Sequence, residues 1–188
     1  MIMALANVIT AFGLAGAAGL NAYIPLLLVA VAGRMGFIAL AYPFDILTSW
    51  PAIAALCILL IIEMVVDKIP GADHVNDVVQ TFVRPAAGAV LFAANAGVIQ
   101  GMDPTVGLIA GLVMALTVHG AKAAARPAVN VSTLGFGAPI ISVVEDVVSA
   151  IASFLAIFSP IVFVLFMGLV VFMVVRLVRR IRRRPQVM

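Results

Sequence analysis

Apolar residues run along the chain in long segments separated by charged residues, prolines and glycines. There are six of them, at about residues 5–33, 50–68, 76–99, 104–126, 139–158 and 160–179. The runs are continuously apolar and do not alternate with a period of two, which is typical of membrane helices and not of barrel strands. The connections between them are short, as in a compact bundle. The pattern predicts an all-α integral membrane protein, a single transmembrane domain over residues 1–188 with about six helices.

The first apolar segment is too long for one simple span. It holds no charged residue before Arg34, and at 1.5 Å per residue it would reach about 50 Å, against a hydrocarbon core of about 30 Å. Small and polar residues interrupt it at Gly13, Gly16, Gly19, Asn21 and Pro25. Two interpretations stay open. One is a close-packed helix with a proline kink, and the other is a broken helix whose freed backbone groups line a polar cavity.

A faint internal repeat accompanies these segments. NDVVQTFVRP (Asn76–Pro85) resembles EDVVSAIASF (Glu145–Phe154), which would make the hairpins 50–99 and 104–158 parallel repeats. A rival alignment of IIEMVV with VVEDVV divides the chain into halves that an odd number of spans would make inverted repeats. Both alignments stay open.

Composition and charge agree with a membrane location and suggest an orientation. Hydrophobic residues make up 65% of the chain and charged residues 10%, whereas soluble domains have about 25% charged residues. The net charge of +3 comes largely from the segment Arg176–Arg184, which holds six of the eleven basic residues. This basic tail is typical of a cytoplasmic anchor near anionic lipid, and nucleic acid is not an expected partner. With six spans, both termini are predicted to be cytoplasmic, in a bacterial inner membrane.

Acidic residues concentrate in EMVVDKIPGADHVND, Glu63 to Asp77, which holds four acids, a lysine and a histidine. If Trp50 marks an interface, Glu63 lies about 20 Å into the hydrocarbon core. The same measure puts Arg84, His119 and the pair Glu145/Asp146 about 9 to 12 Å inside. Four helices are therefore predicted to bring ionisable groups to one level in the cytoplasmic half.

Such groups are expected to face the bundle interior. An unpaired charge at the bilayer centre costs at least about 2 to 3 kcal/mol, so pairing or hydration is favoured over contact with lipid. In the fifth segment, polar residues form one helical stripe at Ser142, Glu145, Asp146, Ser149 and Ser153. The candidate residues for binding a substrate or ion are Glu63, Asp67, Lys68, Asp77, Arg84, His119, Lys122, Arg126, Glu145 and Asp146.

The hairpin after the second segment allows two interpretations. Asp73, His74 and Asp77 can cap the next helix, or together with Asp67 they can ligate Mg²⁺, Ca²⁺ or a transition metal. Their spacing matches no established metal motif, and no cofactor is expected. Cys57 lies within an apolar run and is expected to be a buried, unreactive thiol.

Several enzyme classes have no support in the sequence. It contains no HExxH, no GxSxG, no Walker loop and no cysteine cluster, so no enzymatic activity is expected. The first hypothesis is a small secondary transporter or channel-like carrier of a small ion or polar solute, with proton coupling as an option and a homodimer as the expected assembly. The alternative is a non-transporting scaffold or lipid-headgroup-binding protein whose buried charges are structural.

Over nearly its whole length the sequence resembles a bacterial membrane family, domain of unknown function 4126. The resemblance rests on Glu63 with DKIPG, Asp77, RPAAG at Arg84–Gly88, Lys122, Arg126 and Asn130, and Ser142 with Glu145-Asp146. The family pattern often has a threonine where this chain has Ala125, which loosens that part of the match. The resemblance implies a membrane fold and brings no established activity.

Overall fold

A computed structural model describes residues 2–66, 72–96, 102–132 and 137–182, and these residues are almost entirely helical. They form α1 (Ile2–Leu20), α2 (Tyr23–Arg34), α3 (Trp50–Val66), α4 (Ala72–Ala96), α5 (Pro104–Ser132), α6 (Gly137–Phe158) and α7 (Pro160–Arg182), with a short 3-10 helix η1 (Phe44–Thr48) before α3. The prediction of an all-α bundle is confirmed.

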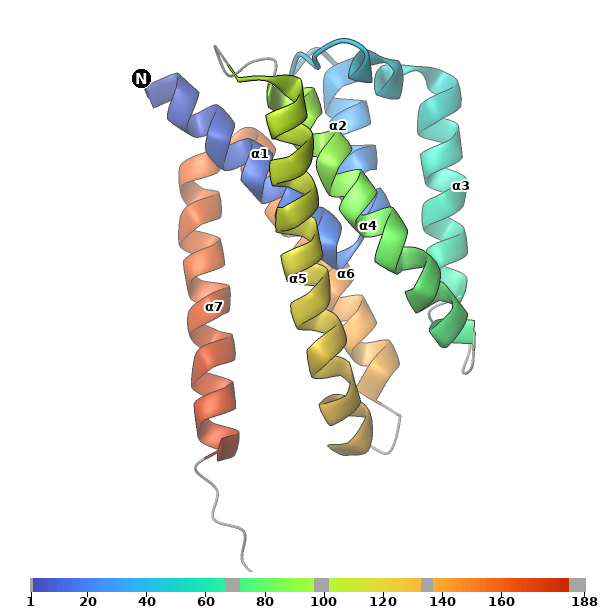
Figure 1. Ribbon diagram of the computed structural model, residues 1–188, viewed down its shortest axis with the longest axis vertical. Helices are drawn as coiled ribbons and strands as arrows, with labels where there is room; N and C mark the ends of the chain where they lie inside the picture. The colour runs from blue at the N-terminus through green and yellow to red at the C-terminus, as the bar shows by residue number, and fades with distance from the viewer. Residues whose placement is uncertain (1, 67–71, 97–101, 133–136, 183–188) are drawn as a thin grey trace, which may run out of the picture.

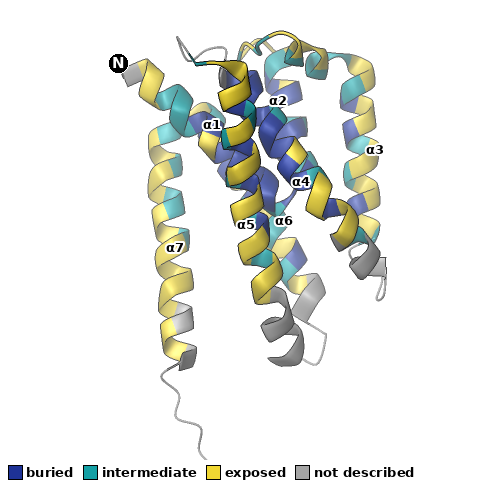
Figure 2. Cartoon of the chain, in the orientation of Figure 1, coloured by how far each residue is buried: buried dark blue, intermediate teal, exposed yellow. Residues whose placement is uncertain are grey.

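Several of these helices are apolar and long enough to cross a membrane. They include Met3–Leu20, Pro104–Ala125 and Ile140–Phe158, and shorter apolar helices cover Tyr23–Arg34, Trp50–Val66 and Pro160–Arg176. Large hydrophobic side chains such as Phe82, Ile109 and Val144 lie exposed on the outside. Buried positions gather where α1, α2 and α4 meet, whereas α7 and α3 are largely exposed (Figure 2). These features are those of a membrane protein.

The first apolar segment is a broken helix, as one of the two interpretations predicts. α1 ends at Leu20 and α2 begins at Tyr23, and the Asn21 side-chain oxygen accepts hydrogen bonds from the amides of Tyr23 and Ile24 at 3.0 and 3.1 Å. Pro25 falls in the first turn of α2, where a missing N–H costs nothing. Asn21 and, four residues later, Pro25 therefore mark the end of one helix and the start of the next.

The broken segment turns back on itself. α1 runs from the N-terminus into the bundle, and α2 returns to the end from which α1 came (Figure 1). The twelve residues of α2 measure about 18 Å, little more than half of a hydrocarbon core of about 30 Å. The two helices together thus enter and leave the bundle at the same end.

This turn changes the predicted arrangement of the termini. The start of α1 and the last described turn of α7 lie at opposite ends of the bundle (Figure 1), whereas the sequence-based prediction puts both termini on one side. The physical reason is that the first segment turns back at Asn21, so it does not carry the chain from one end of the bundle to the other. Helices α3 to α7 then run between the two ends of the bundle in alternating directions (Figure 1). Because their number is odd, α7 ends opposite to the start of α1.

Small residues allow the central helices to approach closely. A Cβ atom added to Gly111 would overlap the backbone of Gly88 in α4, and one added to Gly19 would lie 2.6 Å from the carbonyl oxygen of Ala115. Close backbone approach through small residues is the usual basis of helix packing in membranes. It fixes α1, α4 and α5 against one another, and these helices carry many of the polar residues described next.

Candidate functional site

The first polar cluster joins α3, α4 and α5. Glu63 Oε1 lies 3.1 Å from Arg84 Nη2, and both side chains are only 2% exposed. Arg84 Nη1 lies 3.4 Å from His119 Nδ1, and the other ring nitrogen of His119 lies 3.2 Å from the Thr81 hydroxyl. We call Glu63, Thr81, Arg84 and His119, with the adjoining Tyr23 and Gln80, the Glu63 cluster. It is a buried ion pair extended by an imidazole and a hydroxyl.

Gln80 and Arg84 each have one buried side-chain atom with no hydrogen-bond partner among the described residues. The Gln80 side chain lies beside the hydroxyl of Tyr23, but its Oε1 atom makes no hydrogen bond, and neither does Arg84 Nε, in the part of the chain that the structure describes. Both residues are 1% exposed. Buried polar atoms are nearly always paired with protein or with ordered water. One acceptor and one donor are therefore available to water or to a small polar solute.

A second polar cluster surrounds the break between α1 and α2. Lys122 Nζ lies 2.6 Å from Glu145 Oε2 and donates to the carbonyl oxygen of Leu20 at 3.2 Å. Asn21 Nδ2 donates to Asp146 Oδ1 at 2.9 Å. The lysine–glutamate contact is an ion pair by distance, although its angles lie outside those of a hydrogen bond. We call Asn21, Lys122, Glu145 and Asp146 the helix-break cluster.

The helix-break cluster satisfies the backbone groups that the break releases. Lys122 neutralises the negative end of α1 at Leu20. The Asn21 amide still donates to the carbonyl oxygen of Ala17 at 3.1 Å, and Ser149 Oγ donates to the same oxygen at 3.0 Å. Asn21 accepts from the first two amides of α2. Positive charge at a helix C-terminus and an amide oxygen at an N-terminus are both stabilising. The cluster therefore holds the broken helix in place.

Six of the ten predicted site residues lie in these two clusters. Glu63, Arg84 and His119 belong to the first, and Lys122, Glu145 and Asp146 belong to the second. The sequence predicts one shared pocket, whereas these six residues lie in two clusters. The clusters are linked through α5, because His119 and Lys122 are three residues apart on one face of that helix.

The remaining candidates lie outside what the structure describes. Asp67 and Lys68 belong to an undescribed segment, and the same holds for the side chains of Asp73, His74, Asp77 and Arg126. The metal site predicted from Asp67, Asp73, His74 and Asp77 thus stays a prediction. Among the described side chains, no group of three or more histidines, cysteines or acids is arranged to hold a metal ion.

The predicted polar stripe of α6 is confirmed by burial. Ser142, Ser149 and Ser153 are buried, and Glu145 and Asp146 are partly buried beside them. On the opposite face the side chains of Val143, Val144 and Val147 are about half exposed. The serine-bearing face therefore turns inward, and the valine face is the one available to lipid.

Uncharged members of the Glu63 cluster escaped the sequence-based prediction. Gln80 and Thr81 precede Arg84 by four and three residues, so helical geometry places all three on one face. Tyr23 comes from α2 and follows the break by two residues. A search for every polar residue within an apolar helix, in place of charged residues alone, would have found Gln80 and Thr81.

A small cavity of about 220 Å³ lies at the end of the bundle where α1 begins. Its polar lining comes from Asn7, Thr10 and Asn95, and the other lining residues are Phe37, Ile38, Ala39 and Ile157. Asn95 Nδ2 donates to the carbonyl oxygen of Leu91 at 2.8 Å, and Thr10 donates to that of Ala156 at 2.7 Å. This cavity contains no charged residue among its described lining.

Comparison with known proteins identifies a family. A family model described as a domain of unknown function, DUF4126, matches residues 8–180. That stretch contains both clusters and all of the helices except the first residues of α1 and the last of α7. Comparisons with the curated proteins and with the solved structures found no match.

Proposed function

The chain belongs to the DUF4126 family, whose description carries no activity, and we propose from its own residues that it is a small secondary transporter or channel-like carrier. The proposed cargo is a proton or another small cation, or a small polar solute moved together with one. Exchange takes place at the Glu63 cluster, and the helix-break cluster supports it. The proposal needs no enzymatic step and no cofactor.

The observation that carries the proposal is the incomplete hydrogen bonding beside a buried ion pair. Gln80 Oε1 and Arg84 Nε lack hydrogen-bond partners among the described residues, although they adjoin the Glu63–Arg84 pair. A purely structural network gains most when every member is satisfied. Ionisable groups inside a membrane bundle commonly mark ion paths or proton relays, and these two atoms supply a place for the moving species.

The charges favour a cation or proton over an anion. The described side chains of the two clusters include three carboxylates, on Glu63, Glu145 and Asp146, against the two cations Arg84 and Lys122. Each cation already has a carboxylate within 3.1 Å, so neither is available to a substrate anion. His119 adds an imidazole, the side chain that changes charge near neutral pH.

We propose an orientation from the distribution of basic residues. Cytoplasmic ends of membrane helices carry an excess of lysine and arginine, so the arginine-rich end of α7 is assigned to the cytoplasm of a bacterial inner membrane. Arg34, at the end of α2, then faces the other side. Since α1 begins at the end of the bundle opposite to the arginine-rich turn of α7 (Figure 1), its start is assigned to the outer side.

Proton flux into liposomes tests the function. The purified chain is reconstituted with the pH dye pyranine inside, and an external acid step is applied while valinomycin and K⁺ set the membrane potential. Wild type is expected to acidify the interior faster than empty liposomes. Glu63→Gln is expected to slow this flux about tenfold or more, which corresponds to about 1.4 kcal/mol of barrier.

The matched control removes an exposed carboxylate by the same substitution. Asp45 lies in η1 and is exposed, and its hydrogen bond to Thr48 uses its backbone oxygen, so Asp45→Asn is expected to behave like wild type. Repeating the assay with Na⁺ or K⁺ as the only external cation, without valinomycin, identifies coupling to those ions. Flux in wild type no faster than in empty liposomes, for all three cations, would count against the proposal.

The alternative is a structural network that holds helices together, and one observation favours it. The Arg84 and Lys122 charges are each already paired with a carboxylate, as a scaffold requires. This alternative predicts that Glu63→Gln unfolds the protein in detergent and that wild type carries no flux. Size-exclusion chromatography of the variant, run beside the flux assay, separates the two.

We also propose that the protein works as a homodimer. A chain of 188 residues offers few helices with which to enclose a pathway, and two-fold symmetric pairs are the commonest assemblies. Sedimentation equilibrium in detergent is expected to give twice the mass of 19.6 kDa after subtraction of the detergent.

A further inference from the structure

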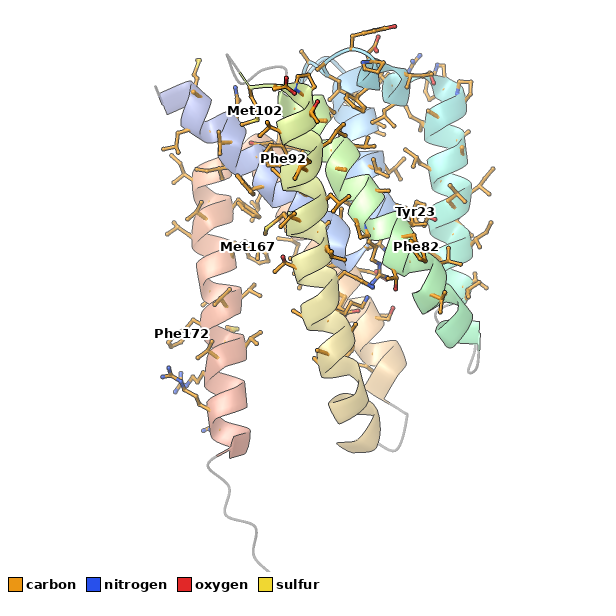
Figure 3. All side chains as sticks on the ribbon, in the orientation of Figure 1. Tyr23, Phe82, Phe92, Met102, Met167 and Phe172 are labelled. Atoms are coloured by element: carbon orange, nitrogen blue, oxygen red, sulfur yellow. The ribbon has the colours of Figure 1, made fainter. Side chains whose placement is uncertain are left out.

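The outward face of α7 carries a groove that the proposed function does not use. α7 lies at the edge of the bundle (Figure 1) and, among the described helices, packs on α6 and α1. A cavity of about 660 Å³ lies on this helix, and its described lining residues are Gly168, Val171, Phe172, Val175, Arg176, Arg179 and Arg180. Phe172 sits on the side of α7 turned away from the other helices (Figure 3). The groove therefore opens toward the surroundings of the bundle.

The lining residues form one helical stripe that changes character along its length. Gly168, Val171, Phe172 and Val175 follow one another at intervals of one or three residues and are apolar. Arg176, Arg179 and Arg180 continue the same face, as the helical repeat requires. From Gly168 to Arg176 the stripe measures about 12 Å, close to one leaflet of a hydrocarbon core about 30 Å thick. The whole apolar part of α7, Pro160–Arg176, measures about 24 Å, so the arginines follow near the end of a hydrocarbon core of about 30 Å.

We propose that this groove binds an anionic phospholipid. One acyl chain lies along Val171, Phe172 and Val175 over the space left by Gly168, and the phosphate is held by the arginines at the end of the stripe. Guanidinium groups pair with phosphate oxygens through two parallel hydrogen bonds.

A second copy of the chain is a poorer fit to this groove. In a symmetric pair the same patch would face itself, and the three arginines of one copy would oppose those of the other. An anionic lipid supplies the opposite charge and an apolar chain in one molecule. The lipid site does not depend on transport, and any homodimer is assigned to another face.

Native mass spectrometry of the full chain in maltoside detergent tests the lipid site. Dioleoyl phosphatidylglycerol is added, and dioleoyl phosphatidylcholine, which has the same acyl chains and a neutral headgroup, is added in a parallel sample. Wild type is expected to retain phosphatidylglycerol at least about tenfold better, since each arginine near an anionic lipid contributes on the order of a factor of five. Arg176→Gln/Arg179→Gln/Arg180→Gln is expected to abolish this preference.

Substitutions at two glycines test the role of the groove separately from that of the arginines. A Cβ atom added at Gly168 would meet no atom within 4 Å, and the same is true at Gly120 on α5, so both positions face open space and are matched sites for a leucine substitution. Gly168→Leu keeps every arginine but fills the groove, and it is expected to lower phosphatidylglycerol retention severalfold. Gly120→Leu is expected to match wild type.

Three results would overturn the proposal. The first is equal retention of the two lipids by wild type. The second is wild-type retention by Gly168→Leu, which would mean that the basic turn attracts lipid without the groove. The third is a dimer peak that disappears in Gly168→Leu while lipid retention stays the same, which would assign the groove to a second copy.

Discussion

The Glu63 cluster and the helix-break cluster each contain one ion pair, fully buried in the first and partly buried in the second, and they differ in how completely their polar atoms are hydrogen-bonded. Around Lys122 and Glu145 the released carbonyl of Leu20 has a partner, and the first two amides of α2 are capped. Around Glu63 and Arg84 the ion pair is more deeply buried, but a donor and an acceptor beside it make no hydrogen bond within the described residues. The first arrangement holds the broken helix in place, and the second includes a donor and an acceptor that can each take a further hydrogen bond.

This difference in hydrogen bonding is a criterion for choosing functional candidates among buried charges. Both pairs would be found by a search for charged residues in membrane helices, and burial alone would not separate them. What separates them is the surroundings of the atoms without a hydrogen bond: Glu145 Oε2 lies 2.6 Å from Lys122 Nζ, whereas Gln80 Oε1 and Arg84 Nε have no hydrogen-bond partner among the described residues, and a network that serves only stability gains nothing from such a donor. Variants that remove one member from each cluster test this difference.

The largest expected effect is the loss of stability in Arg84→Met. This change leaves Glu63 without its cation in a site that is 2% exposed, and breaking a buried pair costs about 3 to 5 kcal/mol. Lys122→Met is expected to cost less, since the Glu145 side chain is 16% exposed and can be hydrated. Thermal unfolding in detergent measures both variants, and equal losses would contradict the distinction between the clusters.

The next expected effect is on flux. Glu63→Gln is expected to slow proton flux into liposomes about tenfold or more, whereas Glu145→Gln is expected to leave most of it, because its role is to hold Lys122 at the end of α1. The pyranine assay measures both. A larger loss in Glu145→Gln, with both variants folded, would place the exchange site at the helix break.

A smaller effect is expected from the residue at the break itself. Asn21→Ala removes the cap of α2 and the bond to Asp146, and loss of such a cap costs about 0.5 to 2 kcal/mol. Asn21→Ser keeps a capping oxygen and is expected to recover part of the loss in thermal unfolding. If Asn21→Ala unfolds at the wild-type temperature, then the break is held by packing alone.

The smallest expected effect concerns a cap outside both clusters. The hydrogen bond from the backbone amide of Thr105, 2.7 Å from Asp103 Oδ1, lowers the pKa of Asp103 below its ordinary value of 3.8. A carboxylate whose pKa is lower in the folded state stabilises above pH 3.8, and this contribution is lost as the pH falls through the lowered pKa. Asp103→Ala is therefore expected to unfold slightly earlier than wild type at pH 7. At pH 2 the two unfolding temperatures should converge, and a gap that stayed constant would contradict the assignment.

Sequence alone predicts much of the fold, because helices in a membrane need long apolar runs and polar stripes need an interior. The inward serine face of α6 followed directly from the spacing of Ser142, Ser149 and Ser153. The broken first helix was one of two open interpretations, but its return to the starting end was not foreseen. A proline kink and a reversal at Asn21 share the same local sequence signals, and tertiary packing decides between them.

Which residues of the two clusters pair with one another was harder to predict than which residues belong to them. Depth along each helix singles out Glu63, Arg84, His119 and Glu145, which lie in the two polar clusters, but depth does not say which helices are neighbours. The pairing of Lys122 with Glu145 depends on how α5 and α6 meet at the broken helix, and this is a property of the whole bundle. Gln80 was missed because it carries no charge.

The central claim is that the Glu63 cluster holds a polar guest inside an apolar bundle. An experimental density map of the protein in a lipid nanodisc, at a resolution that shows ordered water, tests it most directly. We expect density for water or a solute within hydrogen-bonding distance of Gln80 Oε1 and Arg84 Nε. A map without such density, in which apolar side chains pack against both atoms, would contradict the account.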